Sequence, residues 1–273
     1  MNKNLSKTIL YVINIILGLI TVAPIIYTVL MSFTPPDQIF SYPPKLIPKR
    51  IYFKNYIDAL NTAPIIRFII NSFIVSLGVT IGQIVTACLA AFAFSFFNFK
   101  GKKILFLAVI ATMMIPGETT IMSNYLTIGS FGWVDSYKAL IIPYLSAAMG
   151  IFMMRQYYLT LPVELYEAAK IDGCGSFKFF TRIVLPMSRP IVGSLGIYTF
   201  LVTWNQYMWP LLVTSKDSSR TVQIGIGMLQ SVDNQSFGPI MAGIVMILLP
   251  SIVIFIIGQK QLIEGMTSGA VKG

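Results

Sequence analysis

The sequence contains no histidine, only two cysteines and few charged residues. Without histidine it lacks the commonest metal ligand, the usual general base and the side chain that titrates near neutral pH. Cys88 lies in an apolar run and Cys174 in a polar segment, so we expect two free thiols at different depths. These absences exclude catalysis by histidine and argue against a metal site.

A phosphate-binding loop is also missing. Such a loop reads Gly, four residues, then Gly-Lys-Ser or Gly-Lys-Thr. Gly101 and Lys102 have neither the earlier glycine nor the following hydroxyl residue, so they predict only a basic turn. No nucleophile motif or pair of carboxylates stands out. We therefore expect a protein that is not an enzyme, with no catalytic residues and no cofactor in this chain.

Charge is scarce because the chain is strongly apolar. Charged residues make up 11% of the sequence, against about 25% in an ordinary soluble domain, and the mean hydropathy is +0.75. A helix needs about 20 mainly apolar residues to cross a bilayer. The sequence predicts an all-α polytopic membrane protein, with one transmembrane domain over residues 1–273. The six expected transmembrane helices lie at residues 8–33, 65–97, 103–126, 139–158, 189–213 and 238–259.

The first apolar segment resembles a signal peptide only superficially. It is longer than the 7–15 apolar residues typical of a signal, lacks a clear small-x-small cleavage site and is followed by further apolar segments. The next stretch, to Pro64, is polar and contains five prolines before residue 49, which predicts a loop. We therefore expect a first transmembrane helix and then an ordered or partly extended loop.

The net charge of +10 comes from 20 Lys and Arg against 10 Asp and Glu. These cations lie between the apolar segments and form no long basic run, so nucleic acid is not an expected partner. Cytoplasmic loops of membrane proteins are enriched in Lys and Arg. With both termini in the cytoplasm, twelve of the twenty cations lie on that side. This bias favours cytoplasmic termini, and the turn at Lys100, Lys102 and Lys103 contributes most clearly.

The segment at residues 161–186 is too polar for lipid and has a regular pattern. Glu164 and Glu167 favour the start of a helix, and Asp172 with Gly173 favours its end. A second short helix is expected before Pro186. From the residues alone, this could be an amphipathic hairpin that lies on the membrane surface and anchors its neighbours.

The spacing within this segment resembles the EAA loop of binding-protein-dependent ATP-driven importers. That pattern is Glu-Ala-Ala, three residues, Gly, nine residues, Ile, one residue, Leu-Pro. It is filled here at Glu167, Ala168, Ala169, Gly173, Ile183, Leu185 and Pro186.

The resemblance implies a function for the segment as a coupling helix that docks into the ATP-binding subunit. Glu167 and Asp172 would lie on that loop, Glu167 would pair with a basic residue of the ATPase, and Gly173 would allow the turn. Phe177, together with Phe179 and Phe180, would contact the ATPase or the inner ends of the helices.

The same resemblance implies an assembly in a bacterial or archaeal inner membrane. The expected partners are a second permease subunit, an ABC ATPase dimer that binds ATP and Mg, an extracytoplasmic substrate-binding protein and membrane lipid. The ending from Gln259 to Gly273 looks like the tail of carbohydrate permeases of the maltose type. Residues 204–210 look most like glycerol-3-phosphate permeases within that branch.

Glu118 is the clearest acid within an apolar segment, and a charge at that depth is a functional hypothesis by default. Pro116 and Gly117 suggest a broken helix whose free backbone groups line a cavity. Either Glu118 lies on the substrate path, or it is protonated or paired and holds the helices together.

Further candidates for the substrate path are Trp204, Asn205, Gln206 and Tyr207, because aromatic rings stack on sugars while amides bind hydroxyls. Trp209 is also typical of the membrane interface. Asn71, Gln83 and Asn124 are expected as hydrogen-bond partners between helices. The alternative is a secondary transporter or a channel subunit. A secondary transporter is expected to have several acids within the membrane and internal repeats, and this sequence lacks both.

Overall fold

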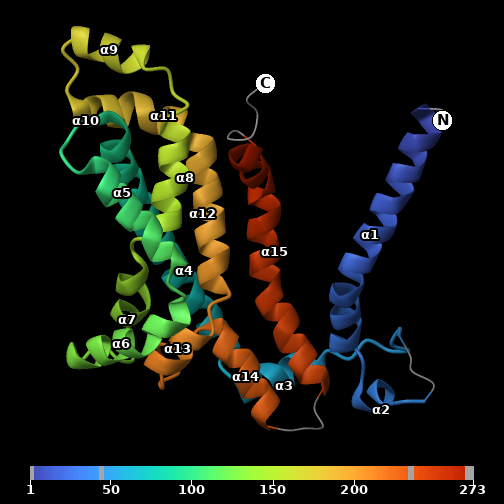
Figure 1. The fold of residues 1–273 in the computed structure, drawn as a ribbon. Helices are drawn as coiled ribbons and strands as arrows, with labels where there is room; N and C mark the ends of the chain where they lie inside the picture. The colour runs from blue at the N-terminus through green and yellow to red at the C-terminus, as the bar shows by residue number, and fades with distance from the viewer. Residues whose placement is uncertain (1–2, 43–45, 233–236, 268–273) are drawn as a thin grey trace. The chain divides into compact units, whose positions relative to one another are not determined.

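The structure is a computed structural model that describes residues 3–42, 46–232 and 237–267. The described residues form helices joined by short loops and contain no β-strand (Figure 1). They divide into two compact units, Met1–Ile66 with Gly225–Leu249, and Arg67–Ile224 with Pro250–Gly273. The all-α prediction is confirmed. Part of the predicted C-terminal tail, residues 268–273, lies outside the described residues.

The first unit is organised around the end of α1 (Lys3–Ser32). α2 (Pro36–Ile39) and α3 (Lys54–Thr62) follow it. Asn55 is buried and donates from its amide nitrogen to the carbonyl oxygens of Ser32 and Thr34, at 2.9 Å each. These bonds satisfy backbone groups left open where α1 ends. The end of α14 (Val222–Val232) and the start of α15 (Phe237–Thr267) complete this unit.

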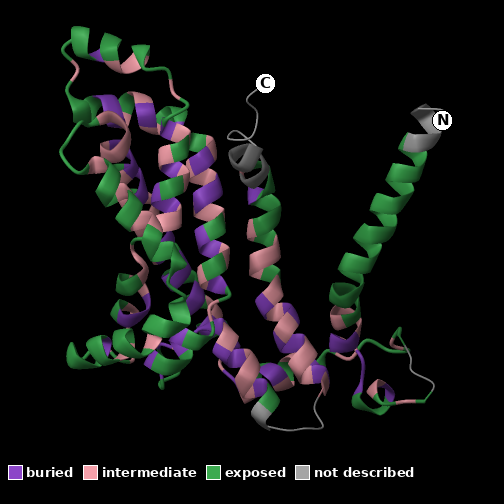
Figure 2. Ribbon diagram, viewed as in Figure 1, coloured by how far each residue is buried: buried purple, intermediate pink, exposed green. Residues whose placement is uncertain are grey.

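Most of α1 has no packing partner among the described residues of the first unit. None of its most apolar stretch, within Lys7–Ser32, is buried, and large apolar side chains are exposed on every side (Figure 2). A helix that is apolar all round requires an apolar environment. An apolar environment must therefore surround α1.

The second unit is built on α4 (Ile65–Phe96), along which two separate apolar cores pack. One core surrounds Val75 and Val79, and the other surrounds Ala87, Ala91 and Phe92. The other helices of this unit include α5 (Lys102–Ala111), α6 (Gly117–Ser130), α7 (Tyr137–Ile141), α8 (Ala148–Tyr158), α12 (Arg189–Trp204) and α13 (Met208–Val213).

Three of the six expected transmembrane segments form continuous helices of spanning length: Lys7–Ser32, Ile65–Phe96 and Phe237–Gln261. The other three are interrupted. The second half of the segment at 103–126 turns by 97° at Ile115 and Pro116, the segment at 139–158 bends by 41°, and the segment at 189–213 divides into α12 and α13. The count of six spans and their grouping into one transmembrane domain stay predictions.

Close packing against α4 depends on glycines at two positions one turn apart. A Cβ atom at Gly82 would collide with the Leu145 side chain and lie 3.4 Å from the Leu145 Cα atom. A Cβ atom at Gly78 would lie 3.0 Å from the Ile141 side chain. Small residues let membrane helices approach closely, so these glycines bring residues 141–145 against α4.

We expect Gly82→Ala to destabilise the purified protein by about 1–3 kcal/mol, because the added methyl group overpacks this contact. Gly129→Ala is the matched control, since Gly129 is also helical but has no atom within 4 Å of its Cβ position. Thermal unfolding in detergent measures both. Equal unfolding temperatures for the two variants would contradict the proposed contact.

Candidate functional site

The candidate coupling loop forms a compact cap at one end of the second unit. It comprises α9 (Glu164–Ile171), α10 (Ser176–Phe179), a wide π turn (Phe180–Val184) and α11 (Leu185–Met187). Figure 1 shows α9 lying across the ends of the other helices of this unit. The predicted order of helix, glycine turn and helix is therefore present.

Gly173 makes the turn between α9 and α10. Its φ of +69° lies in the left-handed region that only glycine adopts readily. The Cys174 amide donates to the Ala169 carbonyl at 2.8 Å, and the Gly173 amide donates to the Lys170 carbonyl at 3.0 Å. This is the Schellman arrangement, which satisfies carbonyl groups at a helix end. Gly173 is thus required by backbone geometry.

The inner face of the loop packs on two aromatic residues of α4, Phe92 and Phe96, which we call the aromatic socket. Phe179 is 1% exposed, with its ring centroid 5.3 Å from that of Phe96. Phe180 is also buried and lies 5.0 Å from Phe92, and the Tyr166 ring lies 5.5 Å from that of Phe96. Such aromatic contacts contribute beyond the area that they bury. The socket holds α9 and α10 together against α4.

The outer face of α9 has no partner within the described chain. Glu164, Glu167, Ala168 and Ile171 follow helical spacing and are all exposed, with Ile171 at 86%. Phe177 at the start of α10 is 75% exposed, and Asp172 is exposed as well. Among the described residues no cation forms an ion pair with these acids. This face of α9 therefore presents exposed acids and apolar side chains outward, while Lys170, Lys178 and Arg182 are exposed elsewhere on the loop.

The end of the motif leads into α12 through a sharp elbow. Ile183 and Leu185 are half-buried against the same core as Phe179. Proline cannot donate a backbone hydrogen bond and clashes with the preceding helical turn, and the wide π turn directly precedes Pro186. Ser188 follows, and the segment Ser176–Met187 makes an angle of 76° with Arg189–Trp204. The candidate coupling loop is thus joined directly to the start of α12.

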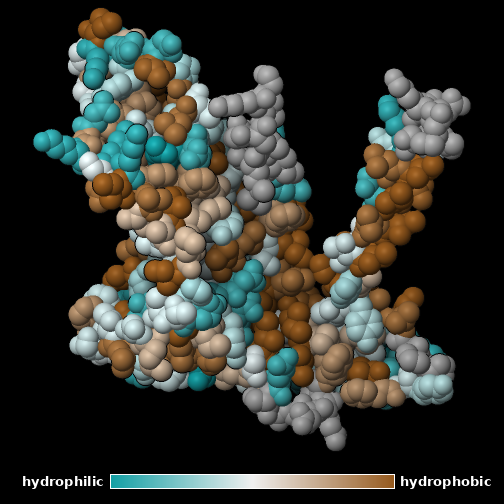
Figure 3. Space-filling model, viewed as in Figure 1, coloured by the Kyte–Doolittle hydropathy of each residue, from teal (hydrophilic) through white to brown (hydrophobic). Residues whose placement is uncertain are grey.

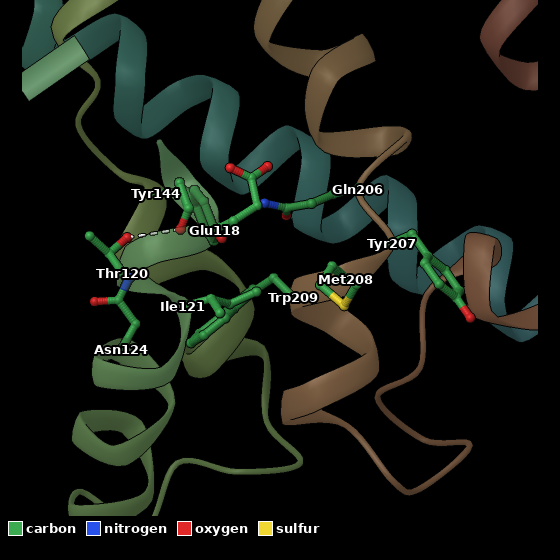
Figure 4. A pocket seen from close by; sticks show the side chains of 10 residues that line it. Glu118, Thr120, Ile121, Asn124, Tyr144, Gln206, Tyr207, Met208 and Trp209 are labelled. Atoms are coloured by element: carbon green, nitrogen blue, oxygen red, sulfur yellow. Dashed lines mark hydrogen bonds between the residues drawn. The ribbon is translucent and has the colours of Figure 1, made fainter. Parts of the chain in front are cut away.

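A second candidate site is a pocket of about 350 Å³ at the opposite end of α12. Glu118, Thr120 and Asn124 line it from α6, and Gln206 and Tyr207 line it from the link between α12 and α13 (Figure 4). Its remaining lining residues are Gly117, Ile121, Tyr144, Met208 and Trp209.

Three of the five predicted path residues therefore meet at this pocket, and two do not. Trp204 is buried and stacks on Phe200, with ring centroids 5.8 Å apart. Asn205 donates to the Leu201 carbonyl and accepts from the Gln223 amide, and it is not part of the pocket lining. Figure 4 shows the Tyr207 ring pointing away from Glu118. The polar lining is thus supplied mainly by Glu118 and Gln206.

Several residues near the pocket have roles that differ from their expected ones. Asn124 lines the pocket instead of joining two helices. Trp209 is only 2% exposed and donates from Nε1 to the Ala139 carbonyl at 3.0 Å, so within the chain it is a core residue. Asn71 and Gln83 do bind neighbouring segments: Asn71 donates to Ser218 and Arg220 carbonyls, and Gln83 to that of Tyr144.

Asp135 ties together two loops near the pocket, a role that the sequence did not indicate. Its carboxylate accepts hydrogen bonds from the Ser215 amide and hydroxyl and from the Lys216 amide, at 2.6–2.8 Å. Its own amide donates to the Val213 carbonyl at 2.8 Å. The Ser215 hydroxyl and then the Lys216 amide lower the pKa of Asp135 to about 2. An ionised Asp135 therefore anchors the end of α13.

Comparison with known proteins identifies the class to which this arrangement belongs. Residues 83–263 match the family described as binding-protein-dependent transport system inner membrane component. The chain belongs to this family, and the match includes both the candidate coupling loop and the pocket. It is the permease component of an importer, a transport subunit without an ATPase site of its own.

Among curated proteins, the chain is similar to sn-glycerol-3-phosphate transport system permease protein UgpE. The Agrobacterium fabrum protein is 33% identical, with 97% of each chain covered. The Rhizobium meliloti protein is 32% identical, covering 97% of this chain and 96% of that protein. The Brucella melitensis protein is 33% identical, covering 92% and 93%.

A solved structure shares the fold. It is the crystal structure of a bacterial ABC transporter involved in the import of the acidic polysaccharide alginate. The matched chain gives a TM-score of 0.82 at 19% identity, covering 95% of this chain and 98% of that one. At this identity the similarity concerns the fold alone.

We expect Phe179→Ala to release the candidate coupling loop, because removing a buried phenyl ring costs about 3–5 kcal/mol. Trypsin should then cut the purified protein faster at Lys170 and Lys178. Phe177→Ala is the matched control, since the Phe177 ring is exposed and its loss should leave cleavage unchanged. Equal cleavage of both variants would show that the aromatic socket does not hold the loop.

Proposed function

We propose that this permease couples ATP hydrolysis in a partner subunit to the passage of a carbohydrate or polyol phosphate through the membrane. The two opposed faces of the loop at residues 161–186 carry this proposal. One face is held by Phe92 and Phe96, and the other presents Glu167, Ile171 and Phe177 outward. A short helix held in this way converts movement of a soluble partner into movement of the membrane helices.

The acidic and apolar character of the outward face supports docking to an ATPase. Glu164, Glu167 and Asp172 would pair with basic residues, while Ile171 and Phe177 would fill an apolar cleft. In this proposal the loop and both termini lie in the cytoplasm. The proposed assembly also contains a second permease subunit, an ATPase dimer that binds ATP and Mg, and an extracytoplasmic binding protein.

The pocket at Glu118 is the proposed part of the substrate path within this chain. α5 and the turn after it have ten and three residues, and helical rises of about 1.5 and 2.0 Å give a length of about 21 Å. The hydrocarbon core is about 30 Å thick, so Glu118 would lie in its outer part. The carboxylate and the Gln206 amide suit a hydroxylated substrate. The names of the curated relatives, which give sn-glycerol-3-phosphate, support a polyol phosphate as the substrate.

We expect Gly173→Val to lower uptake in the reconstituted complex, because a β-branched residue at positive φ distorts the loop. A strain of about 2 kcal/mol corresponds to about a thirtyfold shift in the loop conformation. Gly175→Val is the matched control, since Gly175 has a φ of −65° and open space around it. Substrate-stimulated ATPase activity and uptake are measured at equal permease levels. Wild-type uptake by Gly173→Val would refute the coupling role.

We expect Glu118→Ala to raise the KM for uptake by about 10- to 100-fold, since a hydrogen bond to a charged group contributes about 1.5–3 kcal/mol. Asn205→Ala should leave KM unchanged, because Asn205 lies outside the pocket lining. Binding of the substrate to the isolated binding protein serves as the control for delivery. A larger effect from Asn205→Ala than from Glu118→Ala would place the path elsewhere.

A further inference from the structure

A second pocket, of about 730 Å³, lies near the candidate coupling loop and is not explained by coupling or by the substrate path. It is formed by the turn between α4 and α5, by α5 itself and by the end of α8. We call it the basic pocket. Its lining residues are Asn98, Lys102, Lys103, Phe106, Leu107, Ile110, Phe152 and Arg155.

The charge of the basic pocket is entirely positive. Lys102, Lys103 and Arg155 line it, and none of them forms an ion pair within the described part of the chain. The sequence contains no acid between residues 59 and 117 or between residues 136 and 163, which includes every element of this pocket. Three like charges that converge without a counter-ion favour binding of an anion.

Arg155 is held in position for such a ligand. Its guanidinium carbon lies 4.0 Å from the centroid of the Phe106 ring, and its Nε atom donates to the Phe94 carbonyl at 3.5 Å. Lys102 donates to the Phe97 carbonyl at 2.8 Å and so closes the end of α4. Lys103 is exposed at the rim. Arg155 thus keeps further N–H donors for a ligand, because a guanidinium carries five.

The remaining walls of the pocket are apolar and extend along α5. From Lys102 to Ile110 is about 12 Å at the rise of an α-helix, and Leu107 is 67% exposed. Figure 3 shows hydrophilic residues over α9, α10 and the start of α5, with hydrophobic ones below them. A soluble anion would use only the cations. A molecule with an anionic head and a long apolar chain would use both parts.

We propose that the basic pocket binds one anionic phospholipid, with its phosphate at Lys102, Lys103 and Arg155 and an acyl chain along Phe106, Leu107, Ile110 and Phe152. The proposal rests on the proposed cytoplasmic position of the loop, because the basic pocket lies at the same end of the second unit. Basic pockets between helices on the cytoplasmic side suit anionic head groups. Phe94 and Phe96 share the end of α4, so this lipid would brace the helix that holds the coupling loop.

The test uses photo-crosslinking in the complete importer, because this readout requires no transport. The complex is placed in vesicles of equal parts phosphatidylcholine and phosphatidylglycerol, with a trace of either lipid carrying a photoreactive acyl chain. We expect phosphatidylglycerol to label peptides that contain Phe106 and Phe152 far more than phosphatidylcholine does. Each removed cation should lower this labelling about fivefold.

Lys103→Gln and Arg155→Gln are the test variants. Lys49→Gln and Lys54→Gln are their controls, and each removes one positive charge elsewhere. Arg155→Lys keeps the charge and should keep most of the labelling, which separates charge from misfolding. Equal labelling by both lipids, or unchanged labelling in Lys103→Gln, would overturn the proposal. Competition by inorganic phosphate at matched ionic strength would instead identify a soluble anion as the ligand. The crosslinking result does not depend on uptake, so wild-type uptake by Gly173→Val would refute coupling without changing the lipid labelling.

Discussion

Close packing on α4 is the constraint on which the rest of the second unit depends. Gly78 and Gly82 admit Ile141 and Leu145 on one stretch of this helix, and Ala87 and Ala91 belong to the core beneath the candidate coupling loop. Because lipid removes most of the hydrophobic driving force between membrane helices, close van der Waals contact has to replace it. Small residues on α4 therefore determine where its neighbours can lie.

This packing explains how one loop could influence a distant pocket. The aromatic socket at Phe92 and Phe96 joins the loop to α4, and the elbow at Ser188 joins it to α12. α12 has 16 residues, a length of about 24 Å, and it ends two residues before Gln206 in the pocket lining. Two continuous helices thus run from the candidate coupling loop towards the pocket. α12 leads into Gln206 of the lining, and α4 contacts the lining residue Tyr144 through Gln83.

Local features of the fold, such as turns and helix breaks, were predictable from the sequence. Which distant segments pack against one another was not. The turn at Gly173 and the break at Pro116 follow from the backbone preferences of glycine and proline. The 97° angle at that break, however, depends on contacts of α6 with α13 and α4. The different environments of Phe177 and Phe179 depend on where α4 lies. Asp135 binds residues about 80 positions away, and no local pattern indicates such a contact.

The unpaired charges at the end of the second unit that carries the candidate coupling loop have a common physical explanation. Glu164 and Glu167 on α9 face outward, and Lys103 on α5 and Arg155 on α8 line the basic pocket. Among the described residues, none of these acids forms an ion pair with either cation. Internal pairing would gain little at an exposed surface. In the proposed assembly, the unpaired acids face the basic partner subunit and the unpaired cations face an anionic lipid. The two proposed partners would then bind neighbouring faces of the same end of the second unit.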